Sequence, residues 1–89
     1  MNAFLVEFYL ARSTATTAAA LAARVQDAVA TVGREGAAVR LREFVLEPTE
    51  ELCLCFFEAD SADTIAAVAR LAGLPLDGAP EAVELLEVG

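Results

Sequence analysis

The segment Glu51–Ala59 is the densest apolar stretch of the chain, and it constrains the fold more than any other feature. Six apolar residues stand in a row from Leu52 to Phe57, with a glutamate on either side. A run of this length is too short to cross a membrane and is typical of a strand that is buried on both faces. Since alternate side chains of a strand point to opposite faces, we expect Cys53, Cys55 and Phe57 beneath helices.

Alternation of apolar and polar residues predicts three more strands, at Ala3–Leu10, Val39–Glu47 and Ala82–Val88. The strand at 39–47 carries charges on both faces, as edge strands often do. A tight connection at Pro48–Glu50 predicts that this strand forms an antiparallel hairpin with the cysteine-containing strand.

A 3.6-residue period of apolar residues predicts two helices. The buried stripe of the first consists of Leu21, Val25, Ala28, Val29 and Val32. The stripe of the second consists of Ile65, Val68, Ala69 and Ala72. We expect Ser13 or Thr14 to cap the first helix and Gly33 to end it, while Ser61 caps the second and Gly73 follows its last turn.

The elements follow the order β-α-β-β-α-β in a single domain of residues 1–89, which predicts an α+β, ferredoxin-like fold with a four-stranded antiparallel sheet. Two helices cover only one face of such a sheet. The uncovered face then presents more apolar surface than a soluble monomer normally leaves in water. We therefore predict a homodimer whose interface is formed by Leu5, Leu41, Leu52, Leu54 and Phe56.

The charge and the missing residue types argue against several functions. The net charge is −8, from 14 acidic residues and six arginines, so binding to nucleic acid or to an anionic membrane surface is disfavoured. Without histidine or lysine, the chain has no imidazole base or metal ligand and no Schiff-base lysine. Glu7 interrupts the apolar run Phe4–Leu10, so we expect no signal peptide and a cytoplasmic location.

Carboxylates are the candidate ligand-binding groups. By strand parity, Glu7, Glu43 and Glu58 share the uncovered face with Tyr9. Carboxylates among apolar residues can bind a divalent cation or accept a proton. Glu43 and Glu58 lie toward strand ends, where solvation explains them equally well. Glu7 lies in the middle of its strand and is the strongest candidate, with Glu43 and Tyr9 as its partners.

Two further pairs of residues have both a functional and a structural interpretation. Cys53 and Cys55 could supply thiolates to a soft metal, or they are small buried hydrophobes in a reduced protein. Their i, i+2 spacing on one strand face fits a disulfide poorly. Arg40 and Arg42 could pair with acids across a dimer interface, bind an anionic ligand, or face water.

Four local patterns are Leu5-Val6-Glu7, Cys55-Phe56-Phe57-Glu58-Ala59, Ser61 ahead of Ile65, and Ala72-Gly73-Leu74-Pro75 followed by Asp77. Together they resemble a family of small bacterial proteins of unknown function that includes a nickel-binding protein. The resemblance implies a ferredoxin-like fold that assembles as a dimeric α+β barrel, with a divalent metal as a candidate cofactor. The second strand of that family often carries tryptophan and histidine, where this chain has Leu41 and Glu43, so nickel binding is not carried over.

These features favour a small, cytoplasmic, dimeric binding protein with a cavity between the uncovered sheet faces, for a metal ion or a small apolar ligand. Two alternatives remain open. One is a cofactor-free dimeric-barrel enzyme of oxygenase or isomerase type, with a hydrophobic substrate and Glu7 as general base. The other is a structural or regulatory dimer with a filled interface.

Overall fold

The computed structural model describes residues 1–13, 17–76, 78–86 and 88, and these residues form helices and strands in the expected order. The elements are β1 (Asn2–Tyr9), the 3-10 helix η1 (Leu10–Arg12), α1 (Ala18–Arg34), β2 (Val39–Glu47), β3 (Leu52–Ala59), α2 (Ala62–Ala72) and β4 (Glu81–Val83). The α+β class and the element order that the sequence predicts are confirmed.

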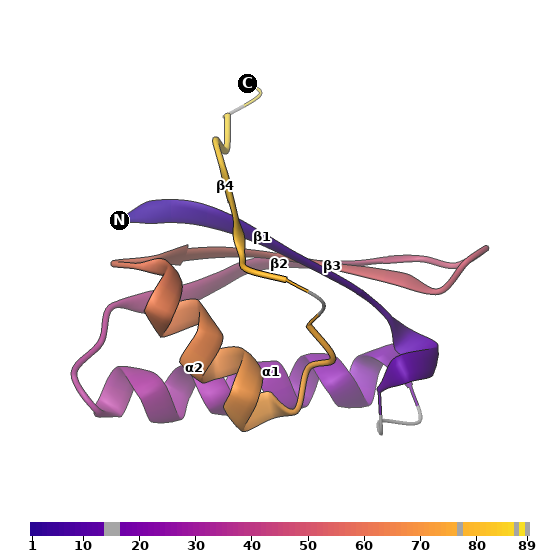
Figure 1. Cartoon of the computed structure of the whole chain (residues 1–89), viewed down its shortest axis with the longest axis horizontal. Coiled ribbons are helices and arrows are strands. Elements are labelled where there is room, and N and C mark those ends of the chain that lie inside the picture. The colour runs from indigo at the N-terminus through magenta and orange to yellow at the C-terminus, as the bar shows by residue number, and fades with distance from the viewer. Residues whose placement is uncertain (14–16, 77, 87, 89) are drawn as a thin grey trace.

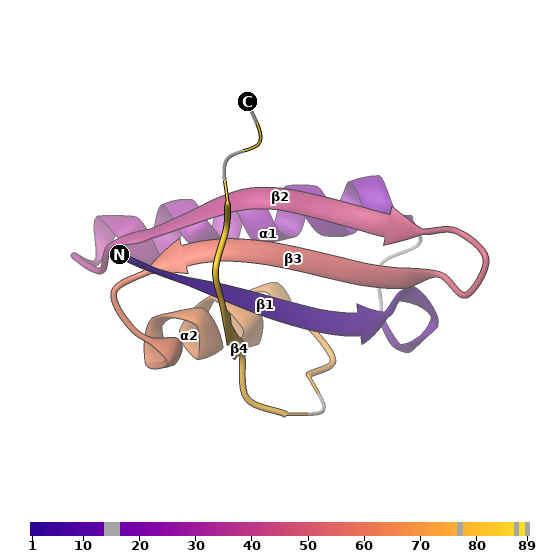
Figure 2. The same cartoon turned by 90° about the horizontal axis from the view of Figure 1, so that it is seen from above.

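The strands form one antiparallel sheet in the order β2-β3-β1-β4, so the cysteine-containing β3 lies inside the sheet. Both α1 and α2 lie on one side of it, and no helix of the described residues lies on the other (Figure 1 and Figure 2). We call the uncovered side the open face. From β1 and β3 it carries Leu5, Glu7, Tyr9, Leu52, Leu54, Phe56 and Glu58.

The hydrophobic core lies between the sheet and the helices and is centred on β3. Cys53, Cys55 and Phe57 are fully buried there, as predicted from strand alternation. The sheet side of the core is completed by Phe4, Val6, Phe8 and Ala59. The predicted helix stripes supply the other side through Leu21, Val25, Ala28, Val32, Ile65, Val68, Ala69 and Ala72.

A β-bulge in β2 changes the face on which part of that strand lies. The pairing with β3 shifts by one residue between Leu41 and Glu43, so Leu41 lies opposite Phe57 and packs against the core. The prediction that Leu41 belongs to the uncovered face is therefore wrong. A bulge adds one residue to one strand only and so exchanges the faces of the residues beyond it. The residues that β2 presents on the open face are Arg40, Glu43, Val45 and Glu47.

The ends of α1 differ from the prediction. Thr17 is its N-cap, and the Thr17 hydroxyl accepts a hydrogen bond of 3.0 Å from the Ala20 backbone N–H. Ser13 instead follows η1, and Thr14 lies outside the described residues. Gly33 lies within the helix, and the left-handed turn occurs at Gly36, where φ is 102°. The sequence therefore predicted the body of this helix correctly and both of its ends incorrectly.

The ends of α2 are as predicted. Ser61 caps the helix by accepting a hydrogen bond from the Thr64 backbone N–H. Gly73 is left-handed, and its N–H and that of Leu74 bond back to the carbonyls of Arg70 and Ala69. This pattern is a Schellman motif, and Leu74 is buried beside it.

Replacing Gly73 with alanine is expected to lower the free energy of unfolding by about 1–2 kcal/mol. Its φ is 71°, and an added Cβ would lie 2.8 Å from Nη2 of Arg24. That nitrogen donates a 2.8 Å hydrogen bond to the Ala72 carbonyl and so links α1 to the end of α2. Urea denaturation followed by circular dichroism measures the loss.

Gly33→Ala is the matched control for this substitution. A Cβ at Gly33 has no neighbour within 4 Å, and the residue lies inside a helix, so this variant should gain about 0.5–1 kcal/mol. A loss at Gly33 as large as that at Gly73 would show that glycine replacement in general, and not the left-handed turn, explains the effect.

The last strand is shorter than the sequence predicts. β4 contains only Glu81–Val83 and pairs with Ala3–Leu5 of β1. The predicted continuation to Val88 is wrong at the described residues 84–86 and 88, where the chain points away from both the sheet and the helices (Figure 1). Within the described residues, the outer edge of β1 beyond Leu5 therefore has no partner strand.

Candidate functional site

Apolar side chains from three strands meet on the open face. Leu54 of β3 lies opposite Glu7 of β1 and Val45 of β2, and Phe56 lies opposite Leu5 and Glu43. Of the predicted interface residues, Leu5, Leu52, Leu54 and Phe56 lie here and are half-buried by their neighbours in the sheet. The structure thus brings together all of the predicted apolar set except Leu41.

The polar candidates lie on the same face, around this apolar set. Glu7, Tyr9 and Glu43 are all exposed on the open face. The register places Glu7 and Glu43 two strands and two residues apart, which corresponds to about 12 Å between their Cα atoms. Within one chain these two carboxylates therefore flank the apolar set on opposite sides.

Metal-ligand clusters are absent from the part of the chain that the structure describes. No group of three or more histidine, cysteine, aspartate or glutamate side chains there is placed to hold a metal ion. Cys53 and Cys55 are free, fully buried and on the helix side of the sheet. Burial raises the pKa of both thiols, that of Cys55 to about 12. These observations favour the interpretation of the cysteines as small core residues.

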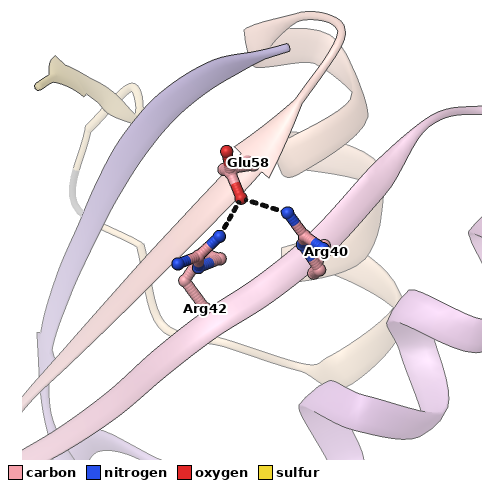
Figure 3. Close-up of polar contacts among 3 residues, drawn as sticks. All are labelled: Arg40, Arg42 and Glu58. Atoms are coloured by element: carbon pink, nitrogen blue, oxygen red, sulfur yellow. Dashed lines mark hydrogen bonds and ion pairs between the residues drawn. The ribbon is translucent and has the colours of Figure 1, made fainter. Parts of the chain in front are cut away.

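An arginine pair on β2 meets a glutamate on β3 at the end of the open face (Figure 3). Arg40 and Arg42 both donate to the same oxygen, Oε1 of Glu58, at 2.7 and 2.8 Å. The Glu58 side chain is 24% exposed, whereas those of Arg40 and Arg42 are 58% and 47% exposed. Both arginine side chains thus remain about half exposed to water despite the ion pair.

The charges of this cluster do not cancel. Hydrogen bonds from Arg40 and then Arg42 lower the pKa of Glu58, so the carboxylate is ionised near neutral pH. Two guanidinium groups and one carboxylate leave an excess of one positive charge, in a chain whose net charge is −8. The cluster therefore favours a carboxylate or another anion in this part of the open face.

The bulge creates this cluster. An unbroken register from the hairpin would place Leu41 opposite Glu58, and Arg40 and Arg42 on the helix side. The one-residue shift instead sets Arg40 directly opposite Glu58. Strand parity alone missed the contact, although two arginines that would otherwise be buried without acceptors are a signal for a bulge.

A shallow cleft lies beside Glu7 at the edge of β1. It has a volume of about 180 Å³ and is lined by Leu5, Val6, Glu7, Leu76, Gly78, Ala79, Pro80 and Glu81. Ligand pockets for drug-sized molecules usually have volumes of about 300–1,000 Å³. The cleft of a single chain is therefore too small to enclose such a ligand.

Comparisons with protein-family models, curated proteins and solved structures found no match. The resemblance noted in the sequence therefore stays a prediction. Among the described residues, every helix is too short or too polar to span a bilayer.

Proposed function

We propose that the chain is a small cytoplasmic binding protein that forms a homodimer through its open faces, as a dimeric α+β barrel. A small apolar ligand occupies the space between the sheets, and Glu7, Tyr9 and Glu43 are the polar groups at its border. The observation that carries the proposal is the apolar set Leu5, Leu52, Leu54 and Phe56, which no described element of the chain covers. The free cysteines agree with a reducing compartment.

A dimer would cover the apolar surface and the cleft that a single chain leaves open. Stacked sheets lie about 10 Å apart, so two open faces exclude water from the apolar side chains between them. The cleft beside Glu7 is open in one chain, and a second sheet closes it from above. A metal ion is the less supported occupant, because the described residues contain no cluster of metal ligands.

Placing a charge at the centre of the open face tests the proposal. We expect the wild-type protein to have twice the chain mass of 9.3 kDa by light scattering at micromolar concentration. Leu54→Glu should weaken the dimer at least about 100-fold, because it buries a carboxylate among apolar groups. Titration with the neutral dye Nile red should reach saturation at one molecule per wild-type dimer and show no saturable site in Leu54→Glu.

Leu71→Glu is the matched control. Leu71 is 56% exposed on α2, on the opposite side of the molecule, so the same change there should leave both the dimer and the dye site intact. A monomeric wild-type protein would overturn the proposal. A dimer without a saturable dye site would instead support the structural alternative, in which the interface is filled.

A further inference from the structure

The charged side chains around the apolar set are mainly acidic. Glu81 of β4 lies directly opposite Leu5 of β1, so its side chain is on the open face. Together with it, the face carries five carboxylates and only two guanidinium groups. Both guanidinium groups are bound to one of these carboxylates, that of Glu58. The other four carboxylates belong to Glu7, Glu43, Glu47 and Glu81.

The side of the face formed by β1 and β4 has no basic residue to balance its acids. Glu7 lies two residues beyond Leu5, so Glu7 and Glu81 are diagonal neighbours on adjacent strands, roughly 7–8 Å apart. Both line the cleft of about 180 Å³. Within the described residues, neither side chain forms an ion pair or a hydrogen bond. The arginines are at the other end of the face, because Glu58 is about 13 Å along β3 from the residue opposite Glu7.

The proposed dimer makes these carboxylates costly unless a cation accompanies them. Two open faces of the same sign repel each other, and water between packed sheets is scarce. A carboxylate that leaves water without a partner loses several kcal/mol of solvation, by general estimates of about that size. A neutral ligand covers the apolar set but leaves the carboxylates unpaired. A ligand with an apolar body and a positive charge meets both requirements.

We propose that the ligand of the open face is an organic cation with an apolar body. Its ammonium group lies between Glu7 and Glu81, and its body lies on Leu5 and Leu54 of the apolar set. The ring of Tyr9, on the same face two residues beyond Glu7, attracts the cation further. This inference rests on the proposed function and names the class of its ligand. A bare divalent ion fits less well, because it requires six or more oxygen ligands and the described residues provide no cluster of three.

Three probes with the same apolar body and different charges test the inference. They are 3-phenylpropylammonium, the neutral 3-phenylpropan-1-ol and the anionic 4-phenylbutanoate, each used to displace Nile red from the wild-type dimer. The ammonium probe should bind at least about tenfold more tightly than the alcohol, and 4-phenylbutanoate should bind most weakly. The advantage of the cation should decrease at about 0.5 M NaCl, where surface charges are screened.

Two isosteric substitutions place the charge preference on named residues. Glu7→Gln and Glu81→Gln should each lower the affinity for the ammonium probe at least about fivefold and leave that for the alcohol unchanged. Glu35→Gln is the matched control, because it removes the same charge from the C-cap of α1, on the helix side of the sheet, and should change neither affinity.

The possible failures are distinguishable. If the alcohol binds as tightly as the ammonium probe at a saturable Nile red site, this inference is wrong while the proposed function stands. An equal loss of cation affinity in Glu35→Gln would also overturn it, since the net charge of the chain would then explain the preference. A protein that is monomeric, or a dimer without a saturable Nile red site, contradicts the proposed binding function itself.

Discussion

Replacing Phe57 with alanine is expected to lower the free energy of unfolding by about 3–5 kcal/mol. Phe57 is fully buried on β3, opposite Phe4 of β1 and Leu41 of β2, and it is the largest of the fully buried side chains. Its removal leaves a cavity in the core between the sheet and the helices, which the surrounding close-packed side chains fill only in part. A domain of this size is stable by about 5–15 kcal/mol, so the loss is a large share of the total. Urea denaturation measures it.

Phe56→Ala is the control, because the adjacent residue has the same side chain on the opposite face. Phe56 is only half-buried in one chain, so this variant should lose about 1 kcal/mol at protein concentrations below the dissociation constant of the proposed dimer. Its loss should grow as the concentration rises, while that of Phe57→Ala should not. Equal losses at low concentration would contradict the assignment of the two faces.

The sequence predicts the centre of the fold well because β3 carries a strong local signal. Its alternation places Cys53, Cys55 and Phe57 in the core, and all of them are fully buried. The stripes of the two helices are equally clear, since Leu21 and Ile65 lie at the positions that a 3.6-residue period gives. These features depend only on the spacing of apolar residues within one segment of the chain.

The faces of β2 depend on its partner strand, and strand parity alone assigns them incorrectly. An unbroken alternation places Leu41 with Glu43, but the bulge separates them and sends Leu41 to the core. The charge pattern holds the missing information, because the unbroken register would leave Arg40 and Arg42 under the helices. The register is the alignment of two paired strands, so the sequence of one strand alone does not determine it.

In the candidate site too, strand alternation predicts some features, while others depend on how the strands pair. Glu7 and Tyr9 lie on the open face as predicted, because β1 follows simple alternation. The contact between Arg40, Arg42 and Glu58 was not predicted, because it needs the bulge. The end of β4 was also missed, since residues 84–86 follow a strand pattern but have no neighbouring strand in the same chain. Both misses concern pairing between segments.

The thiol of Cys55 is expected to react with Ellman's reagent about a thousandfold more slowly in the folded protein than in the unfolded chain. Burial raises its pKa from 9.0 to about 12, which lowers the thiolate fraction near neutral pH about a thousandfold. Cys53 should also react slowly, because burial and then Glu51 raise its pKa. The measurement separates a buried thiol from the thiolate that a soft metal requires.

The labelling rate in denaturing urea is the reference. Both cysteines should react quickly under that condition. Cys55→Ala and Cys53→Ala, measured separately, assign the slow phases to single residues. Fast labelling of either thiol in the folded protein, at unchanged circular dichroism, would contradict its place in the core. It would also restore the interpretation of the pair as metal ligands.

The same burial makes stability depend on pH in the alkaline range. The pKa of Cys55 is about 12 in the folded chain and 9.0 when unfolded, so the folded state holds the proton more tightly. This contribution is fully present below pH 9 and is lost as the pH rises toward about 12. The loss per titrating group is at most about 1.4 kcal/mol per pH unit. The free energy of unfolding of the wild-type protein should therefore fall more steeply above pH 9 than that of Cys55→Ala. Parallel curves for the two proteins would show that Cys55 keeps its ordinary pKa and is not part of a dry core.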